Sequence, residues 1–116
     1  MSGDEARLVQ LCVETAKAMN CYVERLGQRR ADKAGQDAGA PDMLLYVSGR
    51  CIPLELKRAK DRETHTPCGK LSLAQIVAIE RREAQGVETH VVDSVQAFVD
   101  AVNAARRGGR GVRRIR

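Results

Sequence analysis

The sequence is poor in aromatic residues: its 116 positions include no tryptophan, one phenylalanine and two tyrosines. Hydrophobic residues still make up 43% of the chain, which is enough for one core in a domain of this length. That core must therefore be mainly aliphatic. We expect one folded domain over residues 1–105 and a basic, disordered tail over residues 106–116, where arginine and glycine predominate.

Further absences narrow the class of protein. No run of about 18 apolar residues occurs, so no membrane-spanning segment is expected, and the N-terminal residues have no signal-peptide or transit-peptide pattern. The four cysteines form no Cys-x-x-Cys pair, which argues against a zinc site and favours reduced thiols in the cytoplasm. The net charge of +5 is compatible with an anionic partner.

Hydrophobic periodicity predicts helices and strands along most of the chain. Polar, basic loops separate some of them, and Ser72 and Ser94 are predicted N-caps. The order of helix, three strands, helix, strand and helix indicates an α/β fold with a mixed central sheet flanked by helices. The predicted elements are helix 4–19, strands 21–26, 43–47 and 51–57, helix 71–86, strand 87–93 and helix 94–105.

The two strands at 43–57 form a predicted hairpin with an unusual pair of acids. A Ser-Gly turn at residues 48–49 sets the register, in which Leu44 lies opposite Pro53 and Asp42 opposite Glu55. The two carboxylates would then form a non-hydrogen-bonded pair, with Cα atoms about 4.5 Å apart. Like charges in this position destabilise a sheet, and a hard divalent cation is the usual compensation for paired oxygens.

Strand alternation places Lys57 on the same face as Glu55, whereas the intervening Leu56 points to the other face. An ammonium group and two carboxylates on one patch are typical of a site that binds phosphate through a metal ion. The alternative is structural: Asp42 ends a loop after Pro41, and Glu55 and Lys57 are solvent-facing charges on an exposed strand.

These residues lie in a recognisable motif. Pro41-Asp42, followed by Glu-Leu-Lys at residues 55–57, resembles the PD-(D/E)XK nuclease motif. The segment GKLSLAQ, residues 69–75, resembles the one that follows this motif in the VRR-NUC family, where a glutamine on the next helix joins the active site. Gln75 is the matching residue here. Residues 87–102 also resemble the closing strand and helix of that family.

The resemblance implies a restriction-endonuclease-like core and phosphodiester hydrolysis that depends on Mg²⁺ or Mn²⁺. Stand-alone VRR-NUC domains of this size resemble phage or bacterial proteins that act as homodimers on branched DNA, notably four-way (Holliday) junctions. The implied protein is a structure-selective DNA endonuclease in the cytoplasm of a bacterial or phage-infected cell. The alternatives are a nuclease for flaps or other branched DNA, and a catalytically inactive DNA-binding module.

The resemblance also assigns roles to particular residues. Metal ligands would be Asp42, Glu55 and the Leu56 backbone carbonyl, with Glu5 as a further candidate. Glu5 competes for this role with Glu14 on the same predicted helix, and an acid in a first helical turn also stabilises the helix. The implied catalytic residues are Asp42, Glu55, Lys57, Gln75 and Glu5.

Basic residues flank the proposed site in the sequence and are candidate contacts for DNA phosphates. The alternative for each is an ordinary solvated charge. They are Arg29, Arg30, Lys33, Arg58, Lys60 and Lys70.

Overall fold

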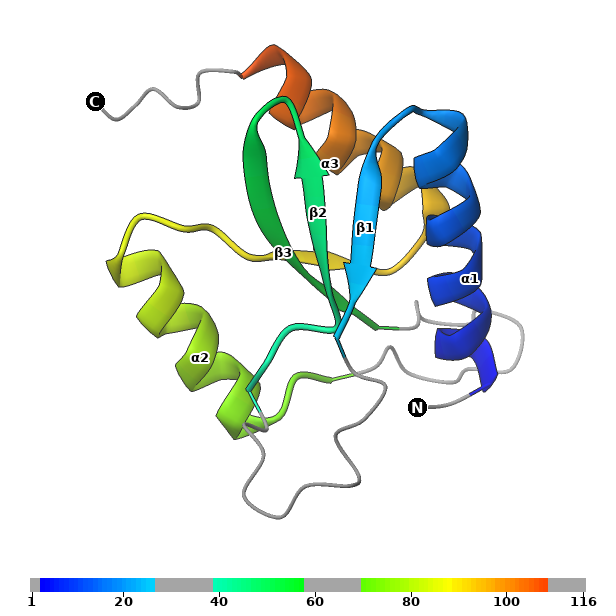
Figure 1. Ribbon diagram of the computed structural model, residues 1–116. Coiled ribbons are helices and arrows are strands. Elements are labelled where there is room, and N and C mark those ends of the chain that lie inside the picture. The colour runs from blue at the N-terminus through cyan, green and yellow to red at the C-terminus, as the bar shows by residue number, and fades with distance from the viewer. Residues whose placement is uncertain (1–2, 27–38, 58–69, 109–116) are drawn as a thin grey trace.

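The computed structural model describes residues 3–26, 39–57 and 70–108. Helices and strands follow one another in the predicted order (Figure 1). Five of the six candidate DNA contacts, all except Lys70, lie outside the described residues, as does residue 109 onward of the expected tail. The elements are α1 Gly3–Ala18, β1 Tyr22–Arg25, β2 Met43–Val47, β3 Arg50–Leu56, α2 Leu73–Ala84, β4 His90–Val92 and α3 Val95–Arg107.

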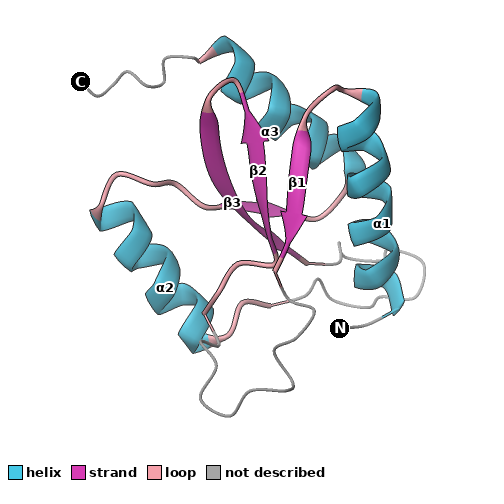
Figure 2. Cartoon of the chain, in the orientation of Figure 1, coloured by secondary structure: helices cyan, strands magenta, loops and turns pink. Residues whose placement is uncertain are grey.

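The four strands form one mixed sheet in the order β1-β2-β3-β4 (Figure 2). Strands β1, β2 and β3 pair antiparallel, and β4 pairs parallel with β3 after the crossover through α2. A parallel partner requires such a crossover because the chain must return to the starting end of the sheet. The predicted mixed α/β architecture is confirmed.

The hairpin of β2 and β3 has the predicted register, since Leu44 lies opposite Pro53. Its two-residue turn places both Ser48 and Gly49 at positive φ, 53° and 76°, as the turns that match strand twist require. Pro53 lacks an N–H, so it cannot donate a hydrogen bond to a strand on its other side. The ladder with β4 begins one residue later, at Leu54, so no bond is required of the proline.

The regular pairing of β2 with β3 stops before the two acids. The last pair is Met43 with Leu54, and the Asp42 N–H then donates to the Leu54 carbonyl at 3.0 Å. Asp42 and Glu55 therefore lie just beyond the end of the ladder, where the backbone no longer repeats the regular cross-strand geometry.

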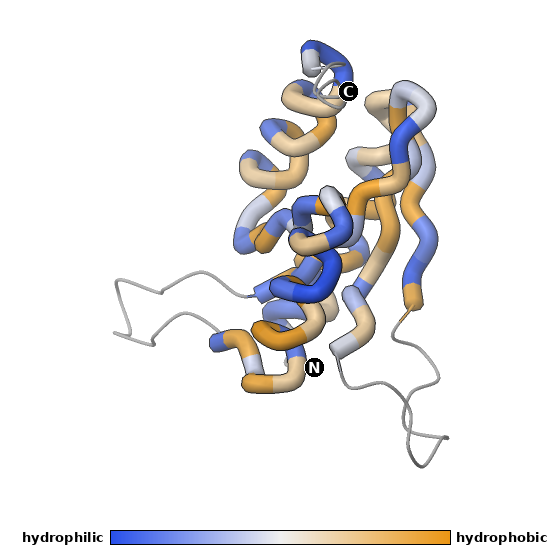
Figure 3. Tube along the Cα trace, turned by 90° about the vertical axis from the view of Figure 1, so that its left-hand side faces the viewer, coloured by the Kyte–Doolittle hydropathy of each residue, from blue (hydrophilic) through white to orange (hydrophobic). Residues whose placement is uncertain are grey.

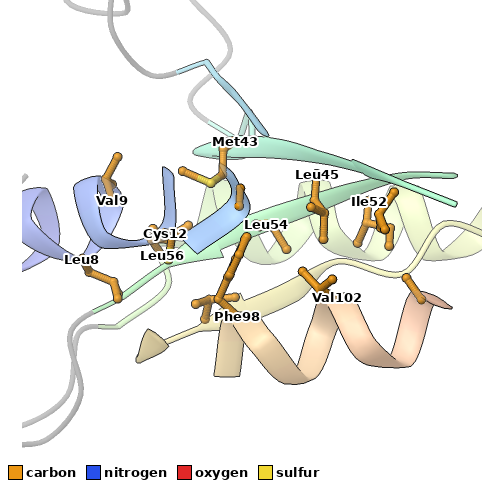
Figure 4. Close-up of a cluster of buried hydrophobic side chains, with 14 residues drawn as sticks. Leu8, Val9, Cys12, Met43, Leu45, Ile52, Leu54, Leu56, Phe98 and Val102 are labelled. Atoms are coloured by element: carbon orange, nitrogen blue, oxygen red, sulfur yellow. The ribbon is translucent and has the colours of Figure 1, made fainter. Parts of the chain in front are cut away.

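Helices α1 and α3 cover one face of the sheet, and the core lies between them and the strands (Figure 4). Hydrophilic and hydrophobic residues alternate along the helices (Figure 3), and α1 and α3 turn their apolar sides toward the sheet. The expected aliphatic core is confirmed, with the single phenylalanine, Phe98, fully buried in it. Its largest buried members include Met43, Leu45, Leu54, Leu56, Val92, Phe98 and Val102.

The opposite face of the sheet carries more exposed side chains. Tyr22 and Tyr46 stack there on adjacent strands with ring centroids 5.5 Å apart, and the Tyr46 hydroxyl donates to Glu24 at 2.7 Å. Helix α2 lies apart from α1 and α3 (Figure 1).

The helix ends follow from local sequence. Ser72 and Ser94 are N-caps, as predicted, and their side chains accept hydrogen bonds from the third helical N–H groups, of Gln75 and Ala97. Helix α3 runs to Arg107, so it includes the first two residues of the expected tail. None of the helices within the described ranges is long and apolar enough to cross a membrane.

Replacing Phe98 with alanine should lower the free energy of unfolding by about 3 kcal/mol or more, because the change leaves a cavity in the core. Chemical denaturation followed by circular dichroism measures this difference. Val87→Ala is the matched control, since Val87 is 39% exposed in the segment before β4, and should change stability by less than about 1 kcal/mol. Equal losses in the two variants would contradict this description of the core.

Candidate active site

Glu55 is a carboxylate buried within the sheet. Its neighbours Leu54 and Leu56 point into the core, so alternation directs Glu55 to the opposite face, where its side chain is 0% exposed. Acidic side chains are almost never fully buried unless they are paired. The groups around the Glu55 carboxylate therefore indicate which chemistry the site supports.

The two oxygens of Glu55 have different surroundings. Oε1 accepts a hydrogen bond from Gln75 Nε2 at 3.1 Å. Oε2 is buried and has no hydrogen-bond partner within the described ranges. A buried polar atom without a partner is uncommon and costly in a native protein, and binding an ion or an ordered water is an ordinary way to satisfy it.

Gln75 is held in one orientation by the start of α2. Its Oε1 accepts from the Ser72 N–H at 2.8 Å, and the Ser72 hydroxyl accepts from the Gln75 N–H at 3.1 Å. This reciprocal pair is a capping box. Because the amide oxygen is already used, the amide nitrogen is the group that faces Glu55. The signal was visible in the sequence as Ser-x-x-Gln at residues 72–75.

Asp42 is fixed to the strands on both sides of it. Its Oδ2 accepts from the Leu56 N–H at 2.8 Å, and its carbonyl accepts from the Leu26 N–H at 2.9 Å. The structure thus brings together Asp42, Glu55 and Gln75. The Leu56 peptide group lies beside them, and its side chain belongs to the core.

The burial of Glu55 raises its pKa to about 7. The first cause is loss of hydration, which disfavours the charged form, and the second is the negative charge of Asp42. A hydrogen bond that the protonated Glu55 carboxyl group can make with Asp42 adds to both. Lys57 and Arg82 act in the opposite direction, since their positive charges favour the ionised carboxylate. Lys57 is accordingly near Glu55, and its backbone N–H joins β3 to β4 through the Val92 carbonyl at 3.0 Å.

Arg82 also lies near Glu55, and it was not among the candidate site residues predicted from the sequence. It lies seven residues after Gln75, about two helical turns, and so on the same side of α2. That spacing is the signal that could have identified it. Its Nε donates to Thr89 Oγ1 at 2.9 Å and its Nη1 to the Gly39 carbonyl at 3.4 Å.

The acids of α1 are placed differently. Glu5 is half-buried in the first turn, whereas Glu14 is exposed and accepts a hydrogen bond from Gln10 at 3.0 Å. Among the described residues, no group of three histidine, cysteine, aspartate or glutamate side chains could hold a metal ion. Glu5 therefore does not complete a three-carboxylate cluster with Asp42 and Glu55.

The donor set nevertheless suits Mg²⁺ or Mn²⁺. Both are hard cations that prefer oxygen ligands, and Mg²⁺ usually keeps several waters while using only one or two carboxylates. Asp42 and Glu55 supply two carboxylates, and the buried Oε2 of Glu55 is an oxygen that a cation would satisfy. Lys70, the one candidate DNA contact in the described ranges, is exposed just before α2.

The four-stranded mixed sheet with its flanking helices defines the class of fold as α/β. No protein-family model matches the sequence, and no curated protein matches it. Two solved structures have the same fold. One, named as a VRR_NUC domain, has a TM-score of 0.64 and 20% identity, and covers 88% of this chain and 97% of its own. The other, named as a VRR_NUC domain protein, has a TM-score of 0.63 and 16% identity, and covers 89% and 88%.

At this level of identity the likeness establishes the fold: the chain has the architecture of VRR-NUC domains. The resemblance suggested by the sequence is confirmed to that extent. Asp42, Glu55 and Gln75, which the motif singled out from separate segments, meet in one place within this fold.

The raised pKa of Glu55 predicts a specific dependence of stability on pH without metal. Between pH 4.5, the ordinary value, and about 7 the folded state holds a proton that the unfolded state has lost. The free energy of unfolding should therefore fall as pH rises through this window, by at most about 3 kcal/mol from Glu55, because Asp42 shares the titration. Denaturation in EDTA at several pH values measures the effect.

Glu55→Gln should remove this part of the fall, because the amide does not ionise. Asp100→Asn, on the exposed side of α3, is the control and should retain it. A Glu55→Gln variant whose stability falls with pH as steeply as that of the wild type would refute the account.

Proposed function

We propose that the protein is a metal-dependent, structure-selective DNA endonuclease that hydrolyses phosphodiester bonds. The observation that carries this proposal is the buried Glu55 carboxylate next to Asp42, with one oxygen lacking a partner among the described residues. A scaffold protein gains nothing from two adjacent acids at the end of a ladder. The VRR-NUC fold supports the same interpretation.

Mg²⁺ or Mn²⁺ would be held by Asp42, Glu55 and the Leu56 backbone carbonyl. Glu5, the further candidate, would have to approach from α1 to join them. When bound, such a cation would neutralise phosphate charge and lower the pKa of a bound water. With the cation bound, two carboxylates and the Lys57 ammonium group would give the site a net charge of about +1, which favours an anionic phosphate.

The residues of the chain itself prepare the site. Gln75 donates a hydrogen bond to Oε1 of Glu55 and so fixes the orientation of the carboxylate. Oε2, which has no partner among the described residues, is then the oxygen left to bind the cation. The backbone N–H of Leu56 engages one Asp42 oxygen and fixes that carboxylate. The Lys57 ammonium group, on the same face as Glu55, orients the attacking water or stabilises the negative charge that develops on the phosphate.

The substrate we propose is branched DNA, with the four-way junction first, cut by a homodimer. A two-fold axis can place two identical sites on two strands of a junction. The basic excess of the chain suits binding through phosphates, which is largely independent of sequence. A bacterial or phage-infected cytoplasm is the proposed location. Flaps or other branched DNA are the alternative substrates, and an inactive DNA-binding module is the alternative function.

A labelled four-way junction should be cut in Mg²⁺ or Mn²⁺ and remain intact in EDTA. Glu55→Ala and Lys57→Ala should each lower the rate at least about a hundredfold, because each removes charge stabilisation at the reacting phosphate. Gel electrophoresis of the products, with linear duplex and flap substrates in parallel, measures both rate and preference.

Asp100→Ala, a change of an exposed acid on α3, should cut at the wild-type rate. Preference for the flap would favour the alternative substrate. A folded, metal-loaded wild-type protein that binds DNA but cuts none of the three substrates would leave the DNA-binding module as the better account.

The homodimer has its own test. Leu73, Ile76 and Val77 are exposed apolar residues of α2, with 76%, 40% and 38% exposure, and we place the dimer contact there. Sedimentation velocity at micromolar concentration should give a dimer for the wild type and a monomer for Val77→Glu, which buries a charge in the contact. Asn103→Glu, on the exposed side of α3, should stay dimeric. A monomeric wild type would exclude the dimer and leave the chemistry of the single site untouched.

A further inference from the structure

Helix α2 is attached to the domain in a different way from the other two helices. None of its twelve residues, all of them described, is buried. By contrast, α3 buries Phe98, Ala101, Val102 and Ala105, and α1 also buries four residues. Apolar packing thus fixes α1 and α3 on the sheet, and α2 depends on polar contacts for its position.

Two side chains on one side of α2 make these contacts. Near the start of the helix, Gln75 reaches Glu55. Two turns later, Arg82 donates from Nε to Thr89 and from Nη1 to the carbonyl of Gly39. Hydrogen bonds from a charged donor are stronger than those between neutral groups, and Arg82 makes two of them, to two separate segments of the chain.

The partners of Arg82 lie on segments that lead into the site. Gly39 precedes Asp42 by three residues, and Thr89 is buried directly before β4, the strand that pairs with Glu55 and Leu56. One guanidinium therefore connects α2, the segment that positions Asp42, and the strand beside Glu55.

An arginine near the C-terminal end of a helix has a simpler explanation, since it stabilises the helix dipole from solvent. Arg81 is exposed and fits that explanation. Arg82 does not, because its Nη2 is buried and has no partner in the described part of the chain. Withdrawing a guanidinium donor from water has a cost that a dipole effect alone does not offset.

We propose that Arg82 is a positioning residue of the nuclease site, which holds α2 and the segment before Asp42 so that Gln75 and Asp42 stay in place around Glu55. This inference rests on the proposed function for its catalytic consequence. Arg82 acts through Gln75, Asp42 and Glu55 and does not touch the substrate. Groups that orient metal ligands in this way typically change metal affinity or activity 10- to 100-fold when they are removed.

Three variants separate this role from the alternatives. Arg82→Met keeps the length of the side chain and removes the charge and the donors. Arg82→Lys keeps the charge but cannot span both Thr89 and Gly39. Thr89→Val keeps the shape of the partner and removes one acceptor. Arg81→Met is the matched control, because it removes the same charge from the adjacent, exposed position.

For each variant we would measure Mn²⁺ affinity by isothermal titration of the protein alone, and kcat and KM for cleavage of the four-way junction in Mn²⁺. We expect Arg82→Met to lose about tenfold or more in both Mn²⁺ affinity and kcat, with KM within about twofold of the wild type. Thr89→Val should lower kcat and Mn²⁺ affinity by less than Arg82→Met does. Arg82→Lys should have values between those of Arg82→Met and the wild type, and Arg81→Met should keep the wild-type kcat and Mn²⁺ affinity.

Wild-type kcat and Mn²⁺ affinity in Arg82→Met would overturn the proposal. So would a loss confined to KM, which would make Arg82 a phosphate contact, and a full recovery in Arg82→Lys, which would make charge alone sufficient. Should Arg82→Met fail to fold by circular dichroism, Thr89→Val decides by the same readouts.

The proposed function can fail separately. If the wild type binds Mn²⁺ but cuts no DNA, the Mn²⁺ affinities still test the role of Arg82. If it binds no Mn²⁺, the hydrogen exchange of the Gln75 side-chain amide, followed by NMR, tests it. Faster exchange in Arg82→Met than in Arg81→Met supports positioning, and equal exchange overturns it.

Discussion

The burial of the Glu55 carboxylate is the interaction on which the other features of the site depend. A strand that fills the core with Ile52, Leu54 and Leu56 must direct the residue between the two leucines to the other face. Placing an acid there removes it from water and raises its pKa. The surrounding groups, an amide donor and two cationic side chains, reduce that cost, and the proposed divalent cation would complete the compensation.

The two faces of the sheet consequently have different roles. One face is covered by α1 and α3 through aliphatic packing, which supplies most of the hydrophobic stabilisation. The other face carries the carboxylates, and α2 approaches it through Gln75 and Arg82. A helix held by polar contacts and not by a core can be placed accurately by hydrogen-bond direction, and its apolar side chains remain available at the surface.

Much of the fold was predictable because it rests on local rules. The turn at Ser48 and Gly49 determines the register of the hairpin, and N-cap serines mark where α2 and α3 begin. Alternation within β3 then places Glu55 opposite the core without further information. The motif resemblance added the placement of Gln75 beside Glu55, which local rules could not supply because twenty positions separate the two residues.

The remaining features depend on contacts between distant segments. Extending the register outward puts Asp42 in a regular pair with Glu55, but the ladder ends one pair earlier, where Asp42 bonds instead to Leu54 and Leu56. The sequence by itself determined the order of elements, the hairpin register and the face on which Glu55 lies, since each follows from neighbours along the chain. Only the tertiary structure decided that Arg82 joins Gly39 to Thr89, and that one oxygen of Glu55 has no partner among the described residues. The reason is that hydrogen bonding and burial depend on which segments meet in space.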